Sequence, residues 1–156
     1  MRQLSHPWTL SWIPDEILVP NPVWLNYIHV PSALGAVPVT YSLKEENDYQ
    51  IDFEEMESKI TDKTKMIVVV NPSNPIGGVF SRETLEKLSE IAIRHDLLVI
   101  ADEIYSQLVY DGTEHVSIAS LPGMKERTIT LGGFSKAYSM TGWRLGYLCA
   151  PVGIIQ

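Results

Sequence analysis

Short apolar runs of strand length recur along the chain and alternate with stretches of helical periodicity. Val, Ile and Leu fill most of these runs almost without interruption, which is typical of strands buried on both faces of a largely parallel sheet. The predicted strands cover residues 16–20, 37–42, 66–70, 97–101, 128–131 and 145–150.

The segments between these runs have features of helices. Ser81 is a suitable N-cap residue, because its hydroxyl can accept a hydrogen bond from a backbone N–H of the first turn. The apolar residues that follow it at helical spacing are Leu85, Leu88, Ile91 and Ala92. Shorter helices are predicted over residues 53–60 and from about 24 to 34. This alternation predicts an α/β fold, a mostly parallel sheet of about six to seven strands flanked by helices and joined by right-handed crossovers.

The composition is that of an ordinary globular domain. Its 156 residues suffice for one core, with 45% hydrophobic and 20% charged residues. The formal net charge is −7 and no Lys/Arg cluster stands out, which argues against nucleic acid or an anionic membrane as the partner. No apolar run reaches the roughly 18 residues of a membrane span, and no signal-peptide pattern follows Arg2. We therefore expect a cytoplasmic protein.

Cysteine and histidine residues point away from a metal site. Cys149 is the single cysteine and lies in an apolar run, so we expect a buried, reduced thiol. His6, His29 and His115 have no metal-ligand spacing with it, and no metal site is predicted. His95 falls at the end of the longest predicted helix, where a structural role beside the helix dipole is expected.

Polar residues follow three predicted strands at their carboxyl ends. The third run leads into Asn74, the fourth into Asp102 and Tyr105, and the fifth into Lys136. Ligands of α/β folds bind at the carboxyl ends of the strands. We therefore expect these side chains to meet at one edge of the sheet.

The surroundings of Lys136 favour covalent chemistry. Small and hydroxyl residues flank it, Ser135 precedes it, and Arg144 follows a short distance along the chain. A lysine that loses its proton attacks a carbonyl carbon, and an arginine beside it can hold an anion. We therefore hypothesise a site for a phosphorylated heteroaromatic aldehyde, with Lys136 forming the imine and Ser135 and Arg144 at the phosphate.

The remaining polar residues fit the ring of such an aldehyde. Asp102 can pair with a protonated ring nitrogen, which makes the ring an electron sink. Tyr105 and Asn74 can donate hydrogen bonds to a phenolic oxygen, and Trp24 can stack on the ring face. Once a substrate amine displaces it, Lys136 can move the α proton as a general base.

Each of these residues also has an ordinary structural alternative, which the sequence leaves open. Lys136 could be an ordinary surface charge, Asp102 an N-cap or turn residue, and Asn74 a turn former. Tyr105 and Trp24 could be core aromatics, and Arg144 could be an ion-pair partner.

Three segments resemble the class I/II, fold-type I aminotransferases that depend on pyridoxal phosphate, the aspartate and aromatic aminotransferase group. Residues 71–77, Asn-Pro-Ser-Asn-Pro-Ile-Gly, are similar to the family's Asn-Pro-x-Asn-Pro-Thr-Gly segment. Residues 102–105, Asp-Glu-Ile-Tyr, are similar to its Asp-Glu-x-Tyr segment, and residues 135–147 resemble its Schiff-base signature. The resemblance extends from roughly residue 15 to the end.

The resemblance implies pyridoxal 5'-phosphate as the cofactor, bound to Lys136, with amino acids and 2-oxo acids as substrates and a homodimer as the assembly. It implies catalytic roles for Lys136, Asp102 and Tyr105. It also implies the ring and phosphate contacts described above, made by Trp24, Asn74, Asp102, Tyr105, Ser135 and Arg144.

The chain departs from this family in length and at single positions. Family members are much longer, so we expect residues 1–14 to be an unrelated leader and residues 15–156 to be part of the large domain, with the small domain missing. Gly133 stands where many members have a phosphate-binding Ser, and Ile76 where Thr is common. We expect this chain to bind pyridoxal phosphate but to turn over poorly.

Other functions stay open. One is a catalytically inactive fragment that retains the sheet, and another is an enzyme similar to the pyridoxal-phosphate-dependent C–S lyases. A nucleotide-binding domain is disfavoured, because no predicted strand is followed by a G-x-G-x-x-G or G-x-x-x-x-G-K-[ST] pattern.

Overall fold

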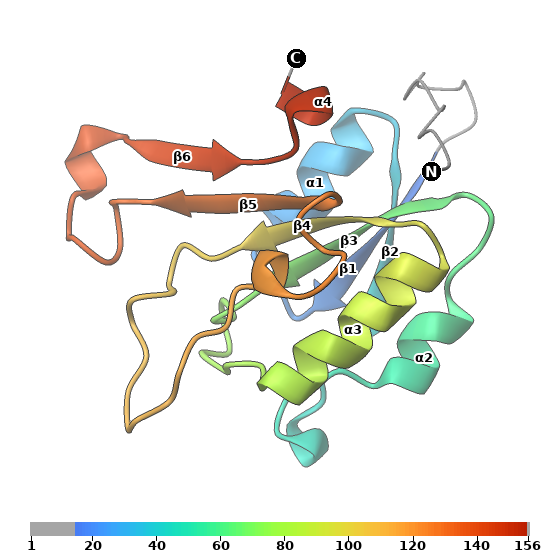
Figure 1. Ribbon diagram of the computed structural model, residues 1–156, viewed down its shortest axis with the longest axis horizontal. Coiled ribbons are helices and arrows are strands. Elements are labelled where there is room, and N and C mark those ends of the chain that lie inside the picture. Colours follow the sequence, from blue (N-terminus) through green and yellow to red (C-terminus); the bar gives the residue numbers. More distant parts are fainter. Residues whose placement is uncertain (1–14, 156) are drawn as a thin grey trace.

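The computed structural model describes residues 15–155, so the leader expected at 1–14 lies outside the described residues. Six strands form one sheet in the order β2-β1-β3-β4-β5-β6 (Figure 1). Neighbouring strands are parallel except β5 and β6, which are antiparallel. The strands are β1 (Glu16–Asn21), β2 (Val37–Ser42), β3 (Thr64–Val70), β4 (Leu98–Asp102), β5 (Thr128–Gly133) and β6 (Gly146–Cys149). The prediction of an α/β fold with a mostly parallel sheet is confirmed.

Helices connect the strands and lie on both faces of the sheet. The α-helices are α1 (Asn26–Ala33), α2 (Phe53–Ser58), α3 (Arg82–Arg94) and α4 (Val152–Ile155). Figure 1 shows α2 and α3 together on one face and α1 behind the sheet. Short 3-10 turns cover Glu45–Asn47, Ile118–Ser120 and Thr141–Trp143. The three helices predicted from the sequence correspond to α1, α2 and α3.

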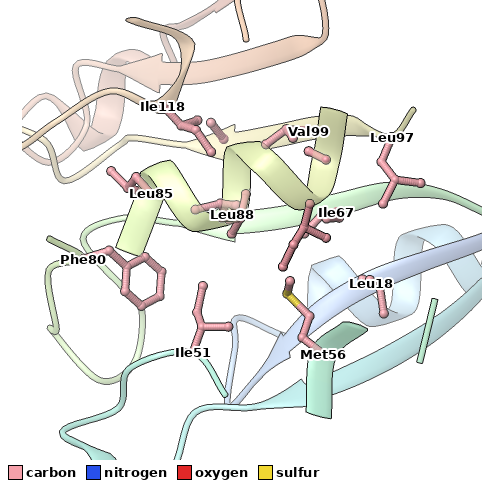
Figure 2. Close-up of a cluster of buried hydrophobic side chains, with 14 of the residues drawn as sticks. Leu18, Ile51, Met56, Ile67, Phe80, Leu85, Leu88, Leu97, Val99 and Ile118 are labelled. Carbon is pink, nitrogen blue, oxygen red and sulfur yellow. The ribbon is translucent and has the colours of Figure 1, made fainter. Parts of the chain in front are cut away.

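Alternate residues of the central strands face the two sides of the sheet. Leu18 and Ile67 belong to the buried cluster under α2 and α3 (Figure 2). Their chain neighbours Val19 and Val68 belong to a second cluster, against which side chains of α1 pack. Because both faces are covered, these strands appear in the sequence as continuous apolar runs rather than as alternating patterns.

The edge strand β6 differs from the others. All four of its residues are exposed, so the expected burial on both faces is wrong for this strand. Cys149 at its end is likewise exposed, not buried as predicted. β6 is an edge strand like β2, but unlike β2 it contributes no side chain to either buried hydrophobic cluster of the described residues, so neither of its faces is covered.

Local contacts define the ends of α3. The Ser81 hydroxyl caps the helix as predicted, accepting a hydrogen bond from Thr84 N at 3.1 Å. At the other end, His95 Nε2 lies 3.0 Å from Glu57 Oε1 of α2. The structural role predicted for His95 is therefore confirmed, and it ties two helices together.

Tyr41 compensates for a proline inside the sheet. Pro20 lies in β1, between β2 and β3, and has no N–H to donate. The pairing of β1 with β3 ends at Leu18 and Ile67. The carbonyl of Val68, one residue farther along β3, accepts a hydrogen bond from the Tyr41 hydroxyl at 2.9 Å. The Tyr41 side chain, which comes from β2, thus gives this carbonyl on β3 the donor that a proline in β1 cannot supply.

Candidate active site

The carboxyl ends of β3, β4 and β5 lie side by side, as the sequence predicted. Asp102 ends β4 and pairs with Val70 on β3 and Leu131 on β5. Backbone hydrogen bonds extend this pairing beyond the strands, from Asn71 N to Asp102 O at 3.0 Å and from Glu103 N to Leu131 O at 2.9 Å. The three polar segments therefore leave the sheet from adjacent positions.

The Asp102 side chain is almost fully buried, at 8% exposure, and both of its oxygens accept hydrogen bonds. Oδ1 accepts from Ile104 N at 3.1 Å, so the turn role considered from the sequence is real. Oδ2 accepts from the Tyr27 hydroxyl at 2.6 Å. Burial raises the pKa of Tyr27 above its usual value, as do the hydrogen bond to Asp102 and the charge of that carboxylate. Tyr27 therefore stays protonated and acts as the donor.

Trp24 lies beside this pair, two residues before α1 begins. Its ring meets the Tyr27 ring edge to face, with centroids 6.1 Å apart and planes at 80°. Trp24 is 51% exposed, so it is not the core aromatic considered as an alternative. The indole thus contacts the residue that donates to Asp102, and its exposed ring leaves a flat apolar surface open.

Lys136 and Tyr105 meet although they follow different strands. Lys136, on the loop after β5, is exposed, and its Nζ lies 5.8 Å from the centre of the Tyr105 ring. Tyr105 is half-buried in the turn after β4. The distance falls within the range of a cation–π contact. Tertiary structure thus brings the amine next to the segment that carries Asp102.

The loop after Lys136 is compact, and Arg144 makes a local contact in it. The backbone N–H groups of Tyr138 and Met140 both donate to Phe134 O, each at 3.3 Å. Arg144 has a left-handed backbone, and its guanidinium donates to Thr141 O at 3.0 Å. Arg144 is exposed and the preceding Ser135 is half-buried. No hydrogen bond among the described residues joins these two side chains.

Asn74 lies in a tight turn after β3. Ser73 N donates to Gly78 O and Gly77 N donates to Ser73 O, both at 2.9 Å, which closes the turn around Asn74. Gly77 has a φ of +80°, a backbone conformation that residues other than glycine rarely adopt. The segment around Asn74 therefore does form a turn, which is the structural alternative that the sequence left open for this residue. Within residues 15–155, no hydrogen bond or ring contact links Asn74 to Asp102 or Lys136.

Gly133, which departs from the family pattern, is tightly enclosed. A Cβ at this position would lie 3.2 Å from Gly146 Cα and 3.3 Å from Leu145 O of the adjoining chain. Both neighbours are backbone atoms, which cannot move aside as a flexible side chain would. Glycine is therefore explained here by the close approach of β5 to the start of β6.

Sequence reasoning missed Tyr27 and the residues beneath Asp102. Tyr27 was detectable in principle, because it follows Trp24 by three positions within the helix predicted from about residue 24, and such residues share one side of a helix. Glu103 is half-buried, and burial raises its pKa despite an opposing hydrogen bond from Ser117 and the nearby His115. His115 Nε2 in turn lies 3.1 Å from Asn71 O, which fastens the long loop before β5 to the end of β3.

Within residues 15–155, no group of three or more His, Cys, Asp or Glu side chains is arranged to hold a metal ion. The same part of the chain contains no helix long and apolar enough to cross a membrane.

Comparison with known proteins decides the family. Residues 12–156 match the family model described as aminotransferase class I and II. The chain belongs to the class I and II aminotransferases. It is 49% identical to the aspartate aminotransferase of Musicola paradisiaca and 42% identical to aromatic-amino-acid aminotransferase 2 of Thermococcus litoralis, in each case over 91% of this chain and 36% of the relative.

The fold agrees with solved structures of the same family. The aromatic aminotransferase of Pyrococcus horikoshii superposes with a TM-score of 0.86 at 42% identity, covering 91% of this chain and 38% of that one. The resemblance seen in the three sequence segments is confirmed. The chain spans about a third of the length of the relatives it matches.

Proposed function

We propose that the complete protein is a transaminase that moves an amino group between an amino acid and a 2-oxo acid with pyridoxal phosphate. Residues 15–156 supply part of its cofactor-binding large domain. The observation that supports this most directly is the meeting of Lys136 with Tyr105, beside the buried Asp102, in a chain of the class I and II family.

The donor set fits pyridoxal phosphate. Asp102 offers a carboxylate whose oxygens each accept one hydrogen bond within the chain and keep lone pairs for another donor. Trp24 offers an exposed aromatic face against Tyr27, the residue that donates to Asp102. Lys136 offers an exposed amine over Tyr105. These are an acceptor for a ring N–H, an apolar surface for a flat ring and a nucleophile for an aldehyde.

When bound, pyridoxal phosphate supplies an electron sink that stabilises negative charge at the substrate α-carbon. Lys136 would hold it covalently through Nζ, and the same amine, when free, would move the proton at that α-carbon. Asp102 accepts a hydrogen bond from the ring N–H, while Tyr105 and Asn74 donate to the phenolic oxygen. Trp24 packs on the ring.

Ser135 and Arg144 are proposed to hold the phosphate. The guanidinium has five N–H donors, of which the described contact to Thr141 O uses one nitrogen. A bidentate contact to phosphate therefore remains open to Arg144. We further propose that the complete protein is a cytoplasmic homodimer, on the basis of the family resemblance.

Covalent trapping tests the assignment of Lys136. The chain is incubated with pyridoxal phosphate, reduced with borohydride and mapped by mass spectrometry. We expect one adduct, on Lys136, which Lys136→Ala abolishes and Lys125→Ala, at an exposed lysine, does not. No adduct on Lys136, or equal labelling of surface lysines, would refute cofactor binding by this chain and would favour an inactive fragment.

Product analysis of the complete protein separates transamination from lyase chemistry. Amino acids are supplied together with a 2-oxo acid, and the new amino acid and any released thiol are measured. We expect amino transfer without thiol release. Release of a thiol from a sulfur amino acid as the main product would instead establish the lyase alternative.

A further inference from the structure

We propose that Tyr27 is a positioning residue that fixes the carboxylate of Asp102 for a ligand N–H and holds the ring of Trp24 beside it. The proposal rests on the proposed function only for the identity of that ligand, pyridoxal phosphate. The contacts that carry it belong to the chain itself.

The first contact is the hydrogen bond between Tyr27 and Asp102. It spans 75 positions of the sequence and joins the start of α1 to the end of β4 at 2.6 Å. That length is typical of an O–H donor on an ionised carboxylate, the stronger class of hydrogen bond. Tyr27 is half-buried and Asp102 is buried, so water competes little for this hydrogen bond.

The second contact completes the restraint on Asp102. Its other carboxylate oxygen accepts from Ile104 N at 3.1 Å, and its main-chain oxygen accepts from Asn71 N at 3.0 Å. With the backbone and both carboxylate oxygens held, rotation of the carboxyl group is restricted before any ligand arrives. A site prepared in this way loses less freedom on binding than one that must be ordered.

The third contact couples Trp24 to the same residue. Its ring packs on the Tyr27 ring at 6.1 Å in an edge-to-face arrangement. One side chain thus touches both the acidic group and the aromatic surface of the site. The hydroxyl of Tyr27 donates to Asp102 and its ring packs against Trp24. A substitution that removes only the hydroxyl therefore separates the restraint on Asp102 from the packing of Trp24.

An anchor for α1 is the competing explanation, because no residue of that helix is fully buried and Tyr27 packs against the second hydrophobic cluster. A matched control exists. Tyr41→Phe also removes a tyrosine hydroxyl that donates to an oxygen in the sheet, but its acceptor is Val68 O, whose strand partner is Ile100 and not Asp102. Tyr27→Phe keeps the ring against Trp24 and removes only the donor to Asp102.

The test compares pyridoxal phosphate with an analogue that has C–H in place of the ring nitrogen and so cannot donate to Asp102. We expect Tyr27→Phe to weaken binding of pyridoxal phosphate about tenfold and to change binding of the analogue less than twofold. Tyr41→Phe should change the ratio of the two affinities less than twofold. Equal losses for both ligands in Tyr27→Phe would reduce Tyr27 to an anchor, and unchanged binding of both would also overturn the proposal.

A second readout needs no cofactor. Hydrogen exchange at the Ile104 amide reports how firmly Asp102 holds this turn. We expect this exchange to be faster in Tyr27→Phe than in Tyr41→Phe when the two variants are compared at the same interval below their melting temperatures. If the unmodified chain fails to bind pyridoxal phosphate, the proposed cofactor binding by this chain is refuted, and this exchange rate still decides whether Tyr27 fixes Asp102. Equal exchange rates in the two variants would contradict the positioning role.

Discussion

The ring of Tyr147 on β6 lies directly over Gly132 on β5. A Cβ at Gly132 would be 2.4 Å from Tyr147 Cζ, closer than atoms can approach. The same ring contacts Phe134 edge to face at 6.0 Å, just before the loop that carries Lys136. Absence of a side chain at Gly132 therefore lets the edge strand pack its aromatic ring on the sheet.

Replacement of Gly132 should disturb this packing. Tyr147 is half exposed, so its ring can move outward, and we expect Gly132→Ala to cost about 1 kcal/mol of the free energy of unfolding. In a Tyr147→Ala background the same replacement should cost nearly nothing, since the clash is gone. Urea denaturation of the four proteins measures this. An equal cost in both backgrounds would show that the strain comes from the backbone and not from the ring.

Loss of the α3 cap should weaken the main hydrophobic layer. Ser81→Ala leaves Thr84 N without its side-chain acceptor, and we expect a loss of about 1 kcal/mol in the free energy of unfolding. Ser58→Ala, which removes an exposed hydroxyl bonded to Glu55 O, is the control and should change stability less. Thermal unfolding followed by circular dichroism compares the two. If both variants melt alike, the cap at Ser81 contributes nothing beyond an ordinary surface hydroxyl.

The contact between α2 and α3 should depend on pH. The hydrogen bond with His95 lowers the pKa of Glu57, helped by the positive charge of Arg94. A carboxyl whose pKa is lower in the folded state stabilises the protein above its unfolded pKa, about 4.3, and loses this contribution as the pH falls through the folded pKa. We therefore expect Glu57→Gln to lower the melting temperature at pH 7.

The difference between Glu57→Gln and the unmodified protein should shrink as the pH falls below about 4.3. Glu90→Gln, at an exposed carboxylate of α3, is the control and should follow the unmodified protein throughout. A melting-temperature difference that stays constant from pH 7 to strongly acidic conditions would show that the charge of Glu57 is not the source of the stabilisation.

Neutralising Asp102 should separate cofactor attachment from catalysis. Asp102→Asn keeps the size of the side chain and an acceptor for Tyr27, but removes the charge that we propose keeps a ring nitrogen protonated. We expect borohydride trapping on Lys136 to persist, while amino transfer in the complete protein falls on the order of a hundredfold or more. Asp62→Asn, in an exposed turn, is the control. An unchanged transfer rate would exclude a role for the Asp102 charge.

Much of the fold was predictable because parallel strands covered on both faces need continuous apolar runs, and β1, β3 and β4 have them. The cap at Ser81 was predictable because it depends on residues within one helical turn. The edge strand β6 was misjudged, since its apolar run is like that of a buried strand, and its exposure depends on which other segments pack against its faces.

The sequence by itself determined the family and the succession of strands and helices along the chain. It also placed Asp102 and Lys136 just at or after the ends of strands. All of these follow from local patterns and contiguous motifs. Only the tertiary structure decided that Lys136 lies over Tyr105 and that Tyr27 holds Asp102. Those contacts join segments far apart in the chain, and their geometry depends on strand order and on where α1 packs. Such information is absent from any local stretch of residues.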